Sequence, residues 1–258
     1  MEVLFIGVIV GKSGKSVISR LLSEIRSKEA IDFVIANAEC AGKEGAGLSP
    51  QDAQDLIDMG IDCLTSGELV WKDKDMVTFL ESTPSTLLRP LNYPPGVPGL
   101  GSFIYGNIGI INLLGRSFLA NIDCPFRVGL AEIERMRQST NLIVIDFHAQ
   151  TTAEKQAFAY YVNGKVSAVL GTHTRVQTAD EHILSEGTGY ITDIGLTGIH
   201  NAVGGMDKEL YIEYFLKGIP ISLKPATTGE SKLDGIILSL DETTGKTISL
   251  RRFCLTSS

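Results

Sequence analysis

The sequence predicts an α/β fold. Short apolar runs rich in Val and Ile, typical of buried parallel strands, alternate along the chain with segments whose apolar residues have helical spacing. The 258 residues are enough to bury one large core, and a composition of 43% hydrophobic and 21% charged residues argues against disorder. No internal repeat or linker interrupts the pattern, so we expect a single domain over residues 1–258.

The first elements form a βαβ unit. Glu2–Val10 and Phe33–Ala36 read as buried strands. The intervening Ser16–Lys28 carries an apolar stripe at helical spacing. A second helix is expected to begin at Ser49-Pro50, where a capping residue precedes proline, and to end at Gly60.

Further strands and a helix follow. The expected strands are Ile61–Thr65, Ile108–Leu114, Leu142–Phe147 and Ser167–Leu170, and the expected helix is Thr152–Tyr161. Residues 82–101 hold five prolines and read as a long irregular loop, which in a compact domain is more often functional than accidental. A terminal hairpin is expected from the alternation in Gly235–Leu240 and Lys246–Leu250.

Charge and cysteine usage narrow the possible partners. A net charge of −7 argues against an extended nucleic-acid surface but leaves room for a small anionic ligand. The four cysteines form no C-x-x-C pair and no disulfide framework, and no apolar run approaches a membrane span. We therefore expect a cytoplasmic protein without a membrane partner, and a homo-oligomer is compatible with the sequence.

A glycine-rich stretch near the N-terminus resembles a phosphate-binding loop only in part. Gly11-Lys12-Ser13-Gly14-Lys15-Ser16 follows a strand and precedes a helix. The motif requires another glycine five positions before its Gly-Lys-Ser, but those positions hold Ile9 and Ile6. A turn feeding a helix is the better interpretation, and a nucleotide-binding loop is kept as an alternative.

Four polar side chains follow four predicted strands. Glu39, Glu68, His148 and His173 each lie just beyond the carboxyl end of a strand, where ligands gather in open α/β sheets. Two carboxylates and two imidazoles suit zinc, iron or manganese. Each residue alone has a structural explanation, but four at equivalent strand ends favour a metal site.

Several longer segments resemble the YmdB family of calcineurin-like phosphoesterases. They occur in order over nearly the whole chain: Leu4-Phe5-Ile6-Gly7, Val34-Ile35-Ala36-Asn37-Ala38-Glu39, Arg89-Pro90-Leu91-Asn92-Tyr93-Pro94-Pro95-Gly96, Asp123-Cys124-Pro125-Phe126, Asp146-Phe147-His148-Ala149, Gly171-Thr172-His173-Thr174, Val176-Gln177-Thr178-Ala179-Asp180, Ile191-Thr192-Asp193 and Gly205-Met206-Asp207-Lys208-Glu209. The resemblance implies a four-layer αββα sandwich. It also implies hydrolysis of phosphodiesters, notably cyclic nucleotides, through two metals.

The same resemblance exposes departures at the metal site. Val8 stands where the family has a metal-binding Asp, and Arg175 stands where it has the second His of His-Thr-His. Glu68 replaces an Asn ligand, and Leu69 replaces the His expected to protonate the leaving group. Outside the ligand set, Lys72 replaces an Asp and Leu100 an Arg. The resemblance thus implies that one half of the two-metal centre lacks its ligands.

The other half of the two-metal centre keeps residues that can ligate a metal. We therefore expect one divalent metal, Mn, Fe or Zn, held by Glu39, Glu68, His148 and His173. Arg175 would stand near the missing metal and could contact phosphate bidentately. Asn92, Tyr93 and His200 complete the expected substrate-binding set.

The main functional expectation is therefore a family member whose hydrolysis of cyclic nucleotides is impaired or lost. Such a pseudoenzyme would retain a single-metal or phosphate-binding site for a regulatory role. The alternative is an active one-metal phosphodiesterase or phosphatase. In either case we expect a small phosphate ester or nucleotide as ligand.

Overall fold

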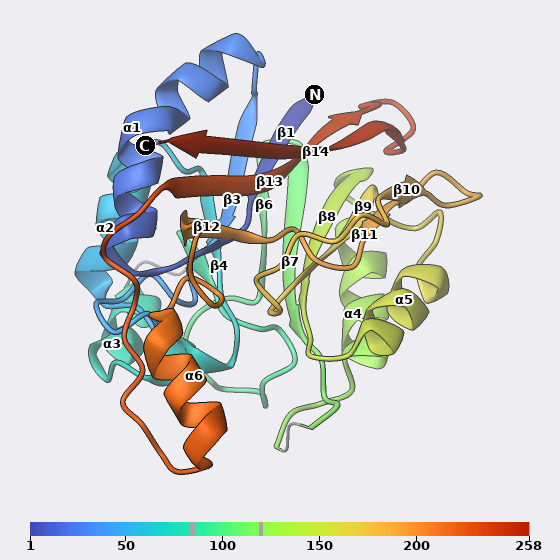
Figure 1. Ribbon diagram of the computed structural model, residues 1–258. Coiled ribbons are helices and arrows are strands. Elements are labelled where there is room, and N and C mark those ends of the chain that lie inside the picture. The colour runs from blue at the N-terminus through green and yellow to red at the C-terminus, as the bar shows by residue number, and fades with distance from the viewer. Residues whose placement is uncertain (83–85, 119–120, 258) are drawn as a thin grey trace.

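Two β-sheets face each other and carry helices on their outer surfaces in the computed structural model, which describes residues 1–82, 86–118 and 121–257 (Figure 1). Helices α1 (Gly11–Lys28), α2 (Pro50–Asp58) and α3 (Asp75–Ser82) cover the first sheet. Helices α4 (Pro125–Met136) and α5 (Thr152–Tyr161) cover the second. This arrangement confirms the predicted αββα sandwich.

The first sheet contains eight strands in the order β2-β12-β13-β1-β3-β4-β5, with β14 paired to β13. Its strands β1, β3, β4 and β5 run parallel to one another, whereas β13 is antiparallel to β1. The bounds are β1 Glu2–Ile6, β2 Val8–Ile9, β3 Phe33–Asn37, β4 Cys63–Thr65, β5 Leu87–Leu88, β12 Leu196–Ile199, β13 Ser231–Leu240 and β14 Thr247–Ser257. The predicted terminal hairpin is thus present and extends further than the alternation indicated.

The second sheet contains six strands in the order β10-β11-β9-β8-β7-β6. Strands β7, β8 and β9 are parallel, so their carboxyl ends lie at one edge. The bounds are β6 Ser102–Tyr105, β7 Ile108–Leu114, β8 Leu142–His148, β9 Ala168–Thr172, β10 His182–Ile183 and β11 Gly189–Ile191.

Alternation along the strands explains how the layers pack. In β1, Val3 and Phe5 belong to the apolar cluster between the sheets, whereas Leu4 and Ile6 pack toward the helices of the first layer. Because successive side chains point to opposite faces, a strand covered on both sides must be apolar throughout. This is the reason why the core strands have no polar alternation.

Helix α1 begins five residues earlier than the sequence indicated. Gly11–Ser16 is the first part of this helix rather than a loop before it. Gly14 allows the helix to approach β12, because a Cβ atom there would lie 2.5 Å from the carbonyl oxygen of Thr197. The glycines therefore serve close packing of α1 on the sheet.

The sequence did not predict helices α3, α4 and α6 (Lys208–Lys217) or the short 3-10 helix η1 (Glu68–Trp71). Helix α6 covers neither sheet, and none of its residues is buried. None of the helices described is both long and apolar enough to span a bilayer.

Candidate metal centre

The carboxyl ends of two strands from each sheet bring the four predicted site residues together. Glu39 follows β3 and Glu68 opens η1 after β4, both in the first sheet. His148 ends β8 and His173 follows β9 in the second sheet. The expected clustering at one rim is what the structure shows.

The donor atoms of these residues converge on the Nε2 atom of His148. Nε2 lies 2.8 Å from Oε2 of Glu39, 3.3 Å from Oε2 of Glu68 and 3.3 Å from Nδ1 of His173. Within the described part of the chain, Glu68, His148 and His173 are the one group of three or more potential ligands whose donor atoms all lie within 4.8 Å. Glu39 adds a fourth oxygen next to them.

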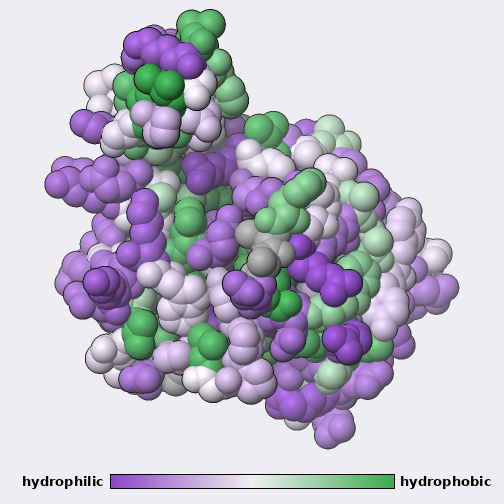
Figure 2. Space-filling view, turned by 90° about the horizontal axis from the view of Figure 1, so that it is seen from below, coloured by the Kyte–Doolittle hydropathy of each residue, from purple (hydrophilic) through white to green (hydrophobic). Residues whose placement is uncertain are grey.

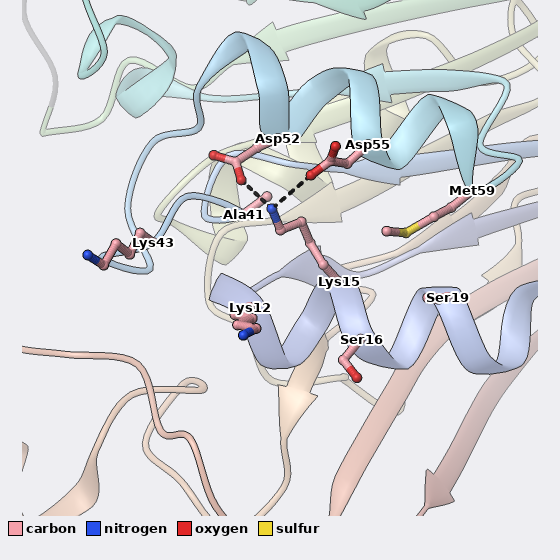
Figure 3. A pocket seen from close by; sticks show the side chains of 9 residues that line it. All are labelled: Lys12, Lys15, Ser16, Ser19, Ala41, Lys43, Asp52, Asp55 and Met59. Carbon is pink, nitrogen blue, oxygen red and sulfur yellow. Dashed lines mark hydrogen bonds and ion pairs between the residues drawn. The ribbon is translucent and has the colours of Figure 1, made fainter.

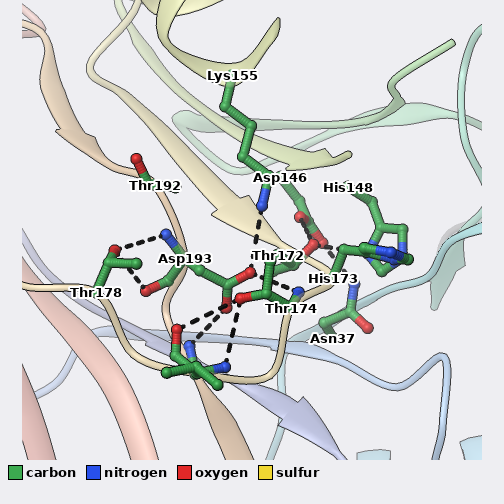
Figure 4. Close-up of polar contacts among 12 residues, drawn as sticks. Asn37, Asp146, His148, Lys155, Thr172, His173, Thr174, Thr178, Thr192 and Asp193 are labelled. Atoms are coloured by element: carbon green, nitrogen blue, oxygen red, sulfur yellow. Dashed lines mark hydrogen bonds and ion pairs between the residues drawn. The ribbon is translucent and has the colours of Figure 1, made fainter. Parts of the chain in front are cut away.

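A buried hydrogen-bond relay orients the His148 ring (Figure 4). The hydroxyl of Thr172 donates to Oδ1 of Asp146 at 2.7 Å and lies 2.8 Å from Nδ1 of His148. Since its only proton goes to Asp146, the Thr172 hydroxyl must accept from Nδ1. Neutral His148 then carries its lone pair on Nε2, the atom that faces the cluster.

Asp146 also links the two sheets beneath the cluster. Its Oδ2 accepts hydrogen bonds from the Asn37 amide at 2.8 Å and from the hydroxyl of Thr65. Burial raises the pKa of Asp146, but three donors and nearby His148 favour its ionised form. The sequence analysis did not predict this role of Asp146. The pattern could have indicated it, because Asp146 is the single carboxylate on an otherwise apolar strand and lies two residues before His148.

The loop after β9 is held in an uncommon conformation. The backbone φ values of His173 and Arg175 are 114° and 61°, in the positive region that residues other than glycine rarely adopt. Oδ2 of buried Asp193 accepts from the backbone N–H of Thr174 at 2.8 Å and lies 3.2 Å from Nζ of fully buried Lys155 (Figure 4). This buried ion pair fixes the loop that presents His173 and Arg175.

Gly67 allows the backbone to pass directly over the cluster. A Cβ atom at this position would overlap Oε1 of Glu39 and lie 2.5 Å from Cδ2 of His148. Beyond it, the backbone N–H of Leu69 donates to Oε1 of Glu39 at 2.8 Å. The start of η1 thus positions Glu39 through the main chain.

The electrostatics of the cluster favour positive charge at its centre. Burial alone would lower the pKa of His148, but the carboxylates of Glu39 and Glu68 outweigh it and raise that pKa to about 10. Burial opposes ionisation of Glu68, yet its interaction with His148 lowers the Glu68 pKa to about 2. Burial and then the charge of His148 lower the pKa of His173.

These residues fit a divalent metal ion. A proton on Nε2 of His148 can serve only one carboxylate, and it serves nearer Glu39. Oε2 of Glu68 is buried and has no hydrogen-bond donor. A cation would satisfy both carboxylates and both imidazoles. Because Gly67 has no Cβ atom, no side chain of its own crowds Glu39 and His148.

The neighbouring side of the site is apolar. Val8 is fully buried in a cluster with Val10, Cys40 and Met206, and Leu69 packs against it. The guanidinium of Arg175 donates to Sγ of Cys40 at 2.9 Å and to the carbonyl oxygen of Gly204 at 3.2 Å. Burial raises the pKa of Cys40 to about 12 despite the nearby Arg175 charge, so this thiol is neutral.

The predicted substrate-binding residues differ in position. Tyr93 makes an edge contact with Trp71 of η1, with ring centroids 5.7 Å apart, and burial and then the charges of Glu68 and Glu39 raise its pKa despite a hydrogen bond from Trp71. It therefore adjoins the site as a neutral phenol. Asn92 is buried. Its side-chain amide donates hydrogen bonds to the carbonyl oxygens of Leu114 and Asp123 and accepts one from the Leu114 N–H, so it holds the loop instead of facing a ligand. His200 is exposed beyond β12, and no described contact of its side chain reaches the cluster.

The structure does not support the phosphate-loop alternative. Lys15, which would have to reach a phosphate, is on α1 and forms an ion pair with Asp52 of α2 and a second with Asp55 at 3.4 Å (Figure 3). A phosphate-binding loop needs free backbone N–H groups wrapped around the anion, whereas Gly11–Ser16 is helical. Lys15 instead joins α1 to α2 beside a pocket of about 430 Å³.

Comparison with known proteins identifies the family. The family model described as YmdB-like protein matches residues 4–253. The chain belongs to the YmdB-like family. A relative from Bacillus subtilis (strain 168), named 2′,3′-cyclic-nucleotide 2′-phosphodiesterase, is 38% identical over 259 residues, covering 99% of this chain and 97% of the relative.

Two solved structures of similar fold support this assignment. A phosphatase from Mycoplasma pneumoniae has a TM-score of 0.91 at 31% identity, covering 99% of this chain and 93% of that one. A protein from Thermus thermophilus, described as hypothetical, has a TM-score of 0.90 at 33% identity, with both chains fully covered. The YmdB-like fold is therefore shared from end to end.

Proposed function

We propose that this protein is a phosphodiesterase or phosphatase that acts on small phosphate esters at a single-metal site. The observation that carries the proposal is the convergence of Glu39, Glu68 and His173 on a lone pair of His148 whose direction is fixed by Thr172. Relatives matched over nearly their whole length are named as enzymes, which favours an active protein over one that has lost hydrolysis. A cytoplasmic location is part of this proposal and agrees with four unpaired cysteines.

The metal would be held by Glu39, Glu68, His148 and His173, and a divalent ion there supplies Lewis-acid polarisation of the phosphoryl oxygen. The chain supplies the remaining groups. Arg175 is half-buried, and the structure gives it no carboxylate partner in the described residues. Besides its hydrogen bonds to Cys40 and Gly204, its guanidinium has further N–H groups that could bind a phosphate. The Tyr93 hydroxyl, kept neutral by its surroundings, is a candidate to donate a proton to the leaving oxygen.

A second metal is not part of the proposal. Val8 has no donor atom and Arg175 is a fixed cation, so neither can ligate a metal beside Glu39. Leu69 contributes its backbone N–H but no titratable side chain. We therefore expect slower turnover than a two-metal centre allows, because activation of the nucleophile and protonation of the leaving group are both weakened.

The test combines metal content with turnover. Purified protein loaded separately with manganese, iron or zinc is expected to hold about one ion per chain by elemental analysis and to hydrolyse 2′,3′-cyclic AMP or a nitrophenyl phosphodiester. The chelated protein, as control, should lose the activity and regain it on reloading. Two ions per chain would contradict the single-metal site.

Binding without turnover would favour the second candidate, a pseudoenzyme that keeps the pocket for a regulatory role. The substitution pattern at Val8 and Leu69 supports this candidate, because both lie where the family chemistry needs polar side chains. Isothermal titration with 2′,3′-cyclic AMP, followed by product analysis of the same sample, separates the two candidates.

Thr172→Val is expected to lower metal affinity about 10–100-fold, because it removes the hydroxyl that orients His148 while leaving all four ligands in place. Thr172→Ser retains a hydroxyl and should bind metal nearly as well as the unmodified protein. Competition with a chromogenic chelator measures both. Equal affinity of the valine and serine variants would show that the relay does not position the ring.

A further inference from the structure

A buried arginine braces the Pro-rich loop from within. Arg89 is 8% exposed, and in the described part of the chain its guanidinium bonds to backbone oxygens instead of a carboxylate. It donates to four carbonyl oxygens of the loop at 2.8–3.3 Å, those of Pro90, Leu91, Val97 and Pro98. Because one rigid planar group holds both ends of this segment, the loop is closed into a fixed ring.

The braced loop presents one side chain to the metal centre. Asn92 is fully buried and bonded to backbone groups of two other segments, whereas residues 94–96 are exposed. Tyr93 lies between them and is half-buried. Its ring contacts Trp71 of η1, and Glu68, the first residue of η1, is near enough for its charge to act on the Tyr93 hydroxyl. The loop therefore holds Tyr93 beside the metal ligands and leaves part of its ring accessible.

Tyr93 and Trp71 form an aromatic wall at this rim. Their ring centroids are 5.7 Å apart and their planes are inclined by 80°. An edge-to-face contact of this kind covers a face of one ring only, and both residues are half-buried. Figure 2 views the molecule from the end toward which β1 runs in Figure 1, and hydrophobic side chains are exposed there among hydrophilic ones. The metal ligands lie at the same end, because β3 and β4 are parallel to β1.

A planar ring is the part of a substrate that such a wall recognises. Nucleobases stack on aromatic side chains, because every base has a π-face. The metal ligands and Arg175 interact with charge, which all phosphate esters share, so they do not distinguish a nucleotide from a sugar phosphate. Selection of the organic group therefore has to come from residues beside them, and Tyr93 is placed there.

We propose that Tyr93, together with Trp71, is specificity-determining and stacks on the base of a nucleotide, and that Arg89 is a positioning residue that acts through Tyr93. This inference rests on the proposed function and adds to it which phosphate esters are preferred. It gives the two parts of one side chain separate roles, because the hydroxyl serves proton donation and the ring serves recognition of the base.

The test compares two esters that differ only in the base, 2′,3′-cyclic AMP and ribose 2′,3′-cyclic phosphate. The ratio of their kcat/KM values cancels effects common to both, such as weaker metal binding or loss of a proton donor. The unmodified chain should prefer the nucleotide by roughly 5- to 150-fold, the range that stacking of one base spans.

Variants of the aromatic wall separate its ring from its hydroxyl. Tyr93→Leu should bring the ratio to about one, because it removes the stacking surface. Tyr93→Phe should lower kcat for both esters and keep the preference. Trp71→Leu, the second variant, should also reduce the preference. Tyr160→Leu, at a tyrosine 64% exposed on α5, is the matched control and should keep the unmodified ratio.

Arg89→Lys tests the positioning role. Lysine keeps the charge but lacks the planar fork that reaches carbonyls at both ends of the loop, so the variant should lose most of the base preference. In a Tyr93→Leu background the same change should lower the preference no further, because Arg89 acts through Tyr93. A purely structural role would lower the unfolding temperature and leave the ratio unchanged. Arg137→Lys, which alters a guanidinium bonded to one surface carbonyl, is the control.

The outcomes separate this inference from the proposed function. Equal kcat/KM values for the two esters, or a folded Tyr93→Leu variant with the unmodified preference, would overturn the inference and leave the hydrolytic function standing. An Arg89→Lys variant with full preference would refute the positioning role. A chain that hydrolyses neither ester would contradict the proposed hydrolysis. Isothermal titration with the same two esters then decides the inference, and equal dissociation constants or no binding would overturn it.

Discussion

Gly67→Ala is expected to lower metal affinity at least about 100-fold and to remove measurable hydrolysis. This loss of affinity is larger than the loss expected when one hydrogen bond that orients a ligand is removed. The added methyl group would overlap Oε1 of Glu39 and lie 2.5 Å from Cδ2 of His148, so both ligands must move. The φ of −151° at Gly67 lies outside the left-handed region that favours glycine, so the expected effect is chiefly the steric overlap at the site.

Gly198→Ala is the matched control. Its Cβ would meet Leu196 at 3.4 Å, an ordinary contact, in a buried strand of the first sheet. Metal titration and turnover assays on both variants, with thermal unfolding of the metal-free proteins, separate a site effect from a folding effect. Metal affinity of Gly67→Ala equal to that of Gly198→Ala would show that the cluster does not hold the ion.

Val8→Asp combined with Arg175→His is expected to raise the metal content from about one to about two ions per chain. Val8→Asp alone places a carboxylate in a fully buried apolar cluster and should cost about 3 kcal/mol or more of folding stability. In the double variant, an ion held by both new side chains and Glu39 should restore stability, by about 4 kcal/mol at a thousandfold excess over its dissociation constant.

Val10→Asp is the control for this experiment, because Val10 is equally buried in the same cluster. It should destabilise the protein without any rescue by metal. Thermal unfolding with and without manganese, together with elemental analysis, distinguishes the variants. A double variant that still binds one ion, or equal rescue of Val10→Asp, would refute the idea that a second half-site can be rebuilt here.

The clustering of the four candidate ligand residues could be predicted because two general rules meet at them. Buried parallel strands appear in a sequence as apolar runs, and ligands gather beyond the carboxyl ends of such strands. Glu39, Glu68, His148 and His173 follow from those rules without any knowledge of how the two sheets pack.

The remaining parts of the site depend on packing and had no local signal. The Leu69 N–H that holds Glu39 would be present with almost any side chain. The role of Thr172 requires Asp146 to lie beneath it, which depends on register between β8 and β9. Asn92 was predicted to belong to the substrate-binding set, yet its amide donates to the backbone carbonyls of Leu114 and Asp123.

The origin of the ligands in two different sheets has a mechanical consequence. Glu39 and Glu68 follow strands of the first sheet, and His148 and His173 end or follow strands of the second. An ion held by all four would therefore cross-link the two halves of the sandwich, in addition to the apolar contacts and the hydrogen bonds of Asp146, Asn112 and Thr247 that already join them. Apolar burial is non-directional, whereas coordination has a fixed geometry. An ion at this rim would therefore add a link of fixed geometry between the two sheets.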